Sequence, residues 1–171
     1  ILLVGAANPC KCGYLTDPAQ ACGRAPLCGE DYMNRISGPL LDRFDLRIEV
    51  PPVRYQDLDV PADGERSARI AARVAMAHDI QFDRYASRPG IFSNSDVEGK
   101  LLEDIATPDP AGRALLADIA QRYGLSARGY HRTLRVARTI ADLSQEEQVR
   151  RKHIAEAVGL RLFQQPLKRS A

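Results

Sequence analysis

The chain has 171 residues, of which 44% are hydrophobic and 27% charged, and its formal net charge is +2. This composition is that of a globular protein able to bury a core, so it excludes fibrous, collagen-like and wholly disordered classes. No apolar run approaches the roughly 20 residues of a membrane helix, and no charged segment precedes the first apolar residues as in a signal peptide. We therefore expect a cytoplasmic protein with no membrane partner.

Two segments in the first third of the chain have strand patterns. Residues 1–6 are uniformly apolar, which predicts a strand with both faces buried, as in a parallel sheet. Because this run begins at Ile1 without an initiator Met, we expect the chain to be a piece of a longer protein. Residues 45–50 alternate apolar and polar side chains, which predicts a strand with one buried face. Short helices are expected between them, at residues 31–35 and 39–42.

All four cysteines lie within 19 residues of a stretch rich in Gly and Pro: Cys10, Cys12, Cys22 and Cys28. In a chain without a secretory signal such clustering favours a local metal site, and a zinc ion held by thiolates would order this loop. The spacing is not that of two Cys-x-x-Cys pairs. Reduced thiols without a metal, and disulfides, therefore stay open as alternatives.

After Pro51 and Pro52 the pattern changes from strand to linker and then to helix. Residues 53–64 are rich in Pro and Asp and have no apolar period. Helical periodicity follows, with helices expected over residues 65–86, 97–105, 110–123, 126–143 and 151–163. A small helical bundle is their economical packing. We thus expect a first domain over residues 1–52, a linker over 53–64, a helical domain over 65–165 and a tail over 166–171.

The helix expected over residues 126–143 carries much of the basic charge. Residues 1–120 hold 13 basic and 18 acidic side chains, whereas residues 121–171 hold 11 basic and 4 acidic. At about 100° per residue, one face of this helix presents Arg128, Arg132, Arg135 and Arg138, and the other is apolar. Like charges at this spacing repel one another, so an anionic partner is expected on the arginine face. A solvated helix face is the alternative.

Three segments resemble one protein family: AANPC with CG at residues 6–13, ISGPLLDRFDL at 36–46, and LSAR with LRVARTIADL at 125–143. They resemble the magnesium-chelatase-related AAA+ ATPases of bacteria, the ComM/YifB-like proteins, from residue 1 to about residue 163. The resemblance covers the C-terminal third of such a protein. It implies an α/β remnant of a P-loop AAA+ sheet, with two strands and the cysteine loop, followed by an all-α helical lid, and a chain that is mostly helical overall.

The resemblance also implies roles for individual residues. Asn8, directly after the first strand, matches the sensor-1 residue that holds the γ-phosphate or the attacking water in line. Arg43 resembles the arginine finger that reaches the nucleotide of an adjacent subunit. Arg128 matches the sensor-2 arginine of the lid, with Arg132 and Arg135 as second choices. Without the resemblance, Asn8 is interpreted as a turn residue, and Arg43 is interpreted as one member of a local surface ion pair.

Departures from the family pattern limit what this chain is expected to do alone. The family commonly has Cys-Pro-Cys-Gly and a close second cysteine pair, whereas Lys11 stands here between the first two cysteines, and some members lack these cysteines altogether. Zinc is therefore not essential to the family's chemistry. No G-x-x-x-x-G-K-[ST] motif and no apolar strand ending in Asp-Glu occurs in the 171 residues, so we expect no ATP hydrolysis by this chain alone.

The resemblance implies part of a homo-oligomeric ring, expected to be a hexamer, that binds ATP and Mg²⁺ mainly through residues outside this chain. Its expected task is ATP-driven branch migration of DNA in recombination and natural transformation. One alternative is the magnesium chelatase motor, which drives metal insertion into a porphyrin. A third reading is a zinc-clipped nucleic-acid-binding module without an ATPase role. The cysteine loop and the TIADL sequence that ends at residue 143 favour the first.

Overall fold

The computed structural model describes residues 2–15, 17, 19–51, 53 and 64–162. Most of the expected linker, and the whole of the expected tail, lie outside the described residues. The chain divides into two compact units, Ile1–Phe44 and Asp45–Ala171. The described residues are mostly helical, as predicted, and none of their helices combines the length and apolar character needed to cross a bilayer.

The first unit holds two short helices, α1 (Leu27–Met33) and α2 (Gly38–Leu41). Helix α2 lies where the sequence predicted it, because the Ser37 side chain accepts a hydrogen bond from the Leu40 backbone N–H and Pro39 stands in the first turn. Helix α1 was predicted at residues 31–35 and begins four residues earlier. Pro26, whose fixed φ suits a helix entry, immediately precedes it.

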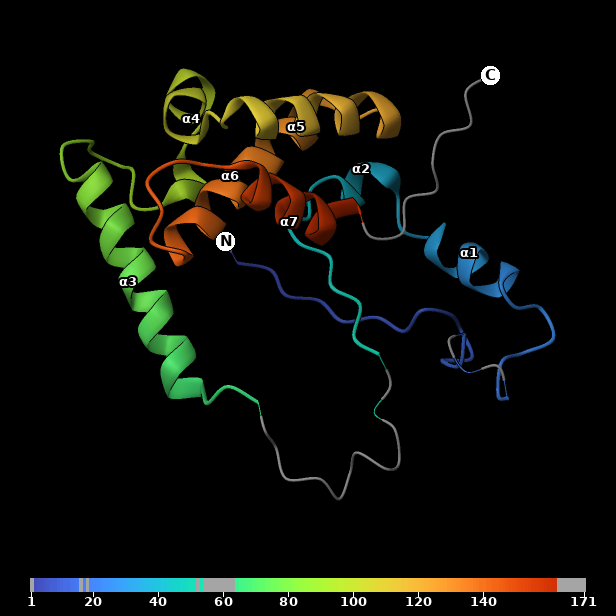
Figure 1. Cartoon of the computed structure of the whole chain (residues 1–171). Coiled ribbons are helices and arrows are strands. Elements are labelled where there is room, and N and C mark those ends of the chain that lie inside the picture. Colours follow the sequence, from blue (N-terminus) through green and yellow to red (C-terminus); the bar gives the residue numbers. More distant parts are fainter. Residues whose placement is uncertain (1, 16, 18, 52, 54–63, 163–171) are drawn as a thin grey trace. The chain divides into compact units, whose positions relative to one another are not determined.

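The second unit is a bundle of helices (Figure 1). It contains α3 (Ser67–Tyr85), a short 3₁₀ helix η2 (Asn94–Asp96), α4 (Gly99–Ala106), α5 (Pro110–Tyr123), α6 (Ala127–Leu143) and α7 (Arg151–Leu162). These confirm the predicted helices to within a few residues, since their ends are set by local chemistry. The Asp109 carboxylate caps α5, and Gly124 ends it with a φ of +58°. The Ser126 hydroxyl accepts from the Gly129 N–H, 2.9 Å away, at the start of α6.

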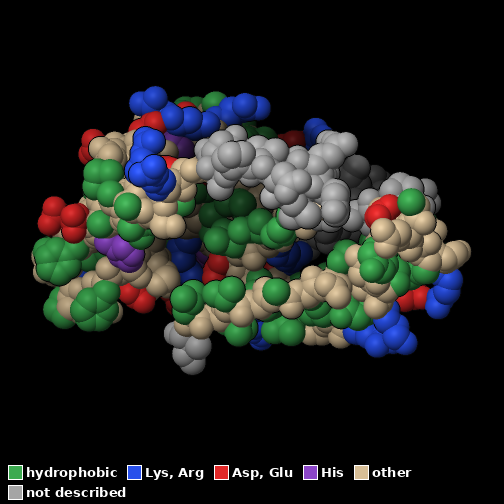
Figure 2. Space-filling view, turned by 90° about the horizontal axis from the view of Figure 1, so that it is seen from below, with side chains coloured by type: hydrophobic (Ala, Val, Ile, Leu, Met, Phe, Trp, Pro, Cys, Tyr) green, Lys and Arg blue, Asp and Glu red, His purple; other side chains and the backbone are tan. Residues whose placement is uncertain are grey.

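The two predicted strands are not formed among the described residues, and that expectation is corrected here. Residues 2–7 and 45–50 have no strand ladder, and the apolar side chains of Leu2, Val4 and Val50 are exposed by 91%, 84% and 84%. Hydrophobic side chains are accordingly visible on the surface in Figure 2. A strand requires backbone hydrogen bonds to a neighbour, and no neighbouring strand lies beside either segment within the part of the chain that the structure describes.

The core of the second unit surrounds α6, which packs against α3, α4 and α7. Its side chains Leu134, Ala137 and Ala141 are almost fully buried. Every other α-helix of the unit adds buried apolar groups: Tyr85 from α3, Leu102 and Ala106 from α4, Leu116 from α5, and Ile154 and Ala157 from α7. Helix α6 is therefore the central element of the bundle, and its orientation is fixed by contacts on several sides.

Candidate functional site

Asn8 and Arg43, the candidate sensor-1 and finger residues, both belong to the first unit and are both exposed. The Asn8 side-chain amide lies beside the turn in which the Gly13 N–H donates to the Cys10 carbonyl oxygen. The Arg43 Nη1 donates to the Pro39 carbonyl oxygen at 2.8 Å, so its guanidinium folds back over α2. Arg128 belongs to the second unit, and the convergence of these three residues on one nucleotide stays a prediction.

Three of the four cysteines form a compact cluster. The Sγ atoms of Cys10, Cys12 and Cys28 all lie within 4.8 Å of one another, Cys10 is fully buried, and the Sγ atoms of Cys10 and Cys12 are 3.1 Å apart. All four cysteines are free thiols. The disulfide alternative is thus not the state of this structure.

The thiols influence one another's protonation, and Cys22 takes part. Hydrogen bonding with Cys10 is the largest cause that lowers the pKa of Cys12 to about 6. Hydrogen bonding with Cys22 is the largest cause that raises the pKa of Cys28 to about 12. The Cys12 thiolate is therefore available near neutral pH, whereas the Cys28 thiol keeps its proton. Thiolate is the form that binds metal ions.

The three arginines expected to contact nucleotide, Arg128, Arg132 and Arg135, line one groove between α4 and α6. The groove has a volume of about 390 Å³, and Glu98, Gly99, Leu102 and His131 complete its lining. Arg128 stands in the first turn of α6, immediately after the capping Ser126, and is exposed. Arg132 and Arg135 follow one and two turns later and are half-buried. The structure thus places these three arginines along one groove, and their role at a nucleotide stays a prediction.

Two of the three groove arginines are held by carboxylates from elsewhere in the chain. The Arg132 Nη1 lies 2.6 Å from the Asp45 Oδ1, and the Arg135 Nη2 lies 3.6 Å from the Glu98 Oε1. The Arg135 Nε also donates to the Val97 carbonyl oxygen at 3.0 Å. Among the described residues no carboxylate pairs with Arg128. On the expected arginine face, the position that keeps its guanidinium clear of a carboxylate among the described residues is therefore Arg128, in the first turn of the helix.

Arg138, the fourth arginine of the expected face, is buried, and that part of the prediction is wrong. Its side chain is 2% exposed and pairs with Asp142, whose side chain is fully buried. It also donates to the carbonyl oxygens of Ile105, Glu146 and Glu147. Burial lowers its pKa below the usual value for arginine. The sequence contained a signal for this pair, because Asp142 follows Arg138 by four residues and so lies on the same side of the helix.

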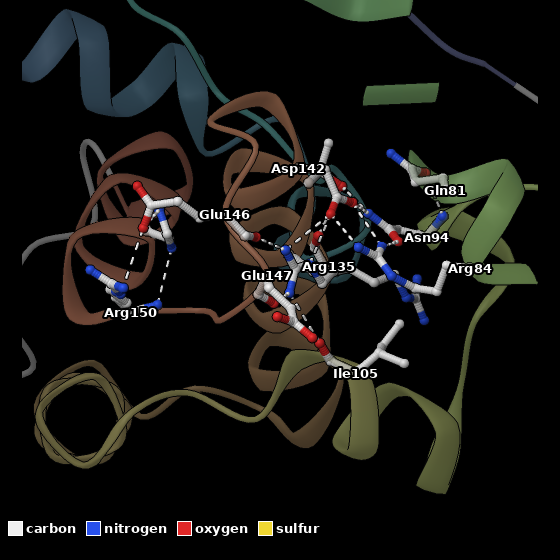
Figure 3. A network of polar contacts seen from close by, with 12 residues as sticks. Gln81, Arg84, Asn94, Ile105, Arg135, Asp142, Glu146, Glu147 and Arg150 are labelled. Carbon is white, nitrogen blue, oxygen red and sulfur yellow. Dashed lines mark hydrogen bonds and ion pairs between the residues drawn. The ribbon is translucent and has the colours of Figure 1, made fainter. Parts of the chain in front are cut away.

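Asp142 is the centre of a polar network that sequence reasoning missed (Figure 3). Arg84 of α3 donates to both Asp142 oxygens, at 2.9 and 2.5 Å, and Asn94 of η2 donates to Oδ2 at 2.8 Å. The Asn94 backbone N–H in turn donates to Gln81. These partners come from positions 48 to 61 residues away from Asp142, so only the folded bundle brings them together. The network joins α3, η2 and α6 and has a structural role.

Comparisons with known proteins give the chain a family context. A family model described as magnesium chelatase, subunit ChlI C-terminal, matches residues 64–161, and one described as magnesium chelatase, subunit ChlI, matches residues 1–58. Competence protein ComM of Haemophilus influenzae is 39% identical over 160 residues, which are 93% of this chain and 30% of that protein. Protein YifB of Salmonella typhimurium is 36% identical over the same shares, and protein Rv2897c of Mycobacterium tuberculosis is 41% identical over 83% of this chain and 27% of its own length. The chain thus spans about 30% of the length of these relatives.

Proposed function

The chain belongs to the family of magnesium chelatase subunit ChlI, and from this premise we propose that it is the C-terminal part of a ring-forming AAA+ ATPase. In the proposal the ATP and Mg²⁺ are held mainly by polypeptide outside these 171 residues. This chain contributes the γ-phosphate sensor Asn8, the arginine finger Arg43 and the lid arginine Arg128.

The observation that carries the proposal is the cationic groove at the start of α6. Arg128 is exposed at this groove, and Arg132 and Arg135 line it further along the helix. A guanidinium that is not held by a carboxylate is suited to bind phosphate through charge-assisted hydrogen bonds. Arg128 is therefore the sensor-2 candidate, ahead of Arg132 and Arg135.

In this proposal Arg128 links the nucleotide to the position of the helical bundle. A ligand shifts a conformational equilibrium only by its difference in affinity for the two states. Arg128 would favour the triphosphate state, since the γ-phosphate offers charge that the diphosphate lacks. Loss of that contact after hydrolysis would release α6, and with it the bundle, as a rigid body.

Arg43 is proposed to act on the ATP of a neighbouring copy in a hexameric ring. Its guanidinium would stabilise charge that develops on the transferred phosphoryl group, an effect that is worth about 10³ to 10⁵ in rate where arginine fingers have been measured. In this structure the exposed Arg43 guanidinium donates to the Pro39 carbonyl oxygen, and in the proposal a phosphate takes the place of that acceptor. Asn8 would orient the attacking water.

The task proposed for the whole protein is branch migration of DNA in recombination and natural transformation. The Haemophilus influenzae relative is named a competence protein, and this supports a role in handling DNA. The magnesium chelatase motor is the alternative that the family description favours. On the full-length protein, a gel shift with branched DNA and a metal-insertion assay with porphyrin would separate the two.

The decisive test of the ATPase proposal is Arg43→Ala in the full-length protein. We expect ATP turnover to fall by about a thousandfold or more while nucleotide affinity stays nearly unchanged, because the finger acts on the transition state. Arg35→Ala, also an exposed arginine of the first unit, is the matched control and should keep full turnover. Retained turnover in Arg43→Ala would remove the finger assignment.

We also propose that the cysteine cluster holds zinc. In a tetrahedral site with Zn–S distances of about 2.3 Å the sulfurs lie about 3.8 Å apart, which the spread of Cys10, Cys12 and Cys28 can accommodate. Cys22, which affects the pKa of Cys28, is the available fourth ligand. Such an ion would crosslink the loop between residues 10 and 28.

Metal content measured by mass spectrometry tests the zinc proposal directly. One zinc per chain is expected in the protein purified without chelator, and a Cys10→Ser and Cys12→Ser double variant should lose it. Protein that retains four titratable thiols and carries no metal would support the unliganded alternative. Salt-sensitive DNA binding by this chain alone would support the third reading, the autonomous nucleic-acid-binding module.

A further inference from the structure

The segment that directly follows Arg43 is fastened to the last two helices of the chain. The Asp45 Oδ1 pairs with the Arg132 Nη1 of α6 at 2.6 Å, and the Asp45 carbonyl oxygen accepts from the Arg161 Nη1 of α7 at 3.2 Å. Two residues on, the Arg47 N–H donates to the Leu160 carbonyl oxygen of α7 at 2.6 Å. Side-chain and backbone contacts thus hold residues 45–47 to two separate helices.

These contacts are partly sheltered from water. The Arg132 side chain is 21% exposed and Arg161 is 5% exposed, although the Asp45 carboxylate is 54% exposed. A lone surface ion pair of this kind stabilises a structure only weakly. Here the ion pair acts together with the two hydrogen bonds that join Asp45 and Arg47 to α7. The attachment is therefore a clamp of several bonds, which we call the 45–47 clamp.

The 45–47 clamp is linked to both proposed nucleotide-contacting arginines, to Arg43 along the chain and to Arg128 along α6. Two peptide units separate Arg43 from Asp45, a span of at most about 7 Å. Arg132 lies one helical turn after Arg128 on the same face of α6, and both line the groove. A displacement of α6 at Arg128 therefore acts on Arg132 directly, and through Asp45 it acts on the chain next to Arg43.

We propose that Arg132 is a positioning residue, which holds the finger-bearing segment through Asp45, and that it is not a second ligand for phosphate. This inference rests on the proposed function, because it takes Arg43 as the finger and Arg128 as the sensor. The 45–47 clamp then couples the nucleotide sensed at α6 to the finger presented by the same chain. To bind phosphate, Arg132 would have to give up its 2.6 Å contact with Asp45, whereas Arg128 has no such partner among the described residues.

The test uses steady-state ATP turnover by the full-length protein with Asp45→Asn, Arg132→Gln and the exchange Asp45→Arg with Arg132→Asp. Both single variants should lower kcat by about two- to thirtyfold, the range of measured coupling effects, with KM and nucleotide affinity changed by less than about twofold. The exchange should restore most of the lost kcat. Asp118→Asn, which removes an exposed ion pair with Arg122 on α5, is the matched control and should leave kcat unchanged.

The background of Arg43→Ala separates this inference from the proposed function. If Arg132 acts through the finger, adding Asp45→Asn to Arg43→Ala should cause no further loss of kcat. The inference is overturned if Arg132→Gln weakens nucleotide binding while Asp45→Asn has no effect, or if neither single variant changes kcat. If Arg43→Ala itself keeps full turnover, the proposed function fails instead. Thermal unfolding identifies any loss of kcat that comes from misfolding. If Arg132→Gln misfolds, the kcat of the isosteric variant Asp45→Asn decides whether the inference holds.

Discussion

Replacing Asp142 by Ala should remove much of the bundle's stability. The carboxylate is fully buried and accepts hydrogen bonds from Arg84, Asn94 and Arg138. Its removal leaves the Arg138 guanidinium, which is 2% exposed, without a counter-charge inside the core. Arg84 is 20% exposed and can turn toward water, so it should contribute less to the loss.

The expected loss in the free energy of unfolding for Asp142→Ala follows from how deeply these side chains are buried. Breaking a buried ion pair by removing one partner costs about 3–5 kcal/mol. Arg138 keeps its bonds to three backbone carbonyl groups, which places the expected loss at the lower end, about 3 kcal/mol. A domain of this size is stable by only about 5–15 kcal/mol, so the effect is large.

Urea unfolding of the 171-residue chain, followed by circular dichroism at 222 nm, measures this loss. Asp118→Ala is the matched control, because its ion pair with Arg122 is exposed and also joins residues four apart on one helix. We expect the control to change the free energy of unfolding by less than about 0.5 kcal/mol. A loss below about 1 kcal/mol for Asp142→Ala would refute the claim that Arg138 depends on this carboxylate.

Three further outcomes are expected in the same unfolding assay. Leu116→Ala, at a fully buried core position, should cost about 2–5 kcal/mol. Ser126→Ala, which removes the cap of α6, should cost about 1 kcal/mol, and Ser126→Asp should restore most of it. Burial lowers the pKa of His153 below its usual value near 6.5, so the unfolded chain takes up the proton first, and stability present above about pH 6.5 should fall as the pH decreases through that value. His153→Gln keeps an acceptor for the Arg150 N–H at the start of α7, and should remove this pH dependence, as melting temperatures between pH 5 and 7.5 would reveal.

The helices could be predicted because their ends are set by residues close in sequence. Ser126 and Asp109 start α6 and α5, and Gly124 separates the two helices. The strands could not be predicted in the same way, because a strand forms only beside a neighbouring strand, and the sequence pattern does not specify that neighbour. Apolar residues 2–4 are compatible with a buried strand, yet they are exposed in this structure.

The candidate site was predictable only where the partners are local. The cysteines lie within one loop, so their clustering follows from spacing. The groove arginines share one face of α6, and helical periodicity predicts that as well. The carboxylate that holds Arg132 comes from Asp45, 87 residues away, and no periodicity indicates such a pair. Helical periodicity places Arg138 on the exposed face, but it does not show that α4 and the turn after α6 cover this position, where Ile105, Glu146 and Glu147 accept its hydrogen bonds.

Helix α6 makes two kinds of contact, and together they determine how a movement at the groove is transmitted to the rest of the chain. Toward its C-terminal end, the bonds of Arg138 and Asp142 tie α6 to α3, η2, α4 and the turn before α7. Breaking these bonds separately would leave buried charges unpaired, so the bundle is expected to move as one body. Toward its N-terminal end, Arg128 faces the groove and Arg132 holds Asp45. A force applied at Arg128 is therefore expected to move the bundle as a whole. In the proposed coupling, the 45–47 clamp passes this movement to the residues that adjoin Arg43.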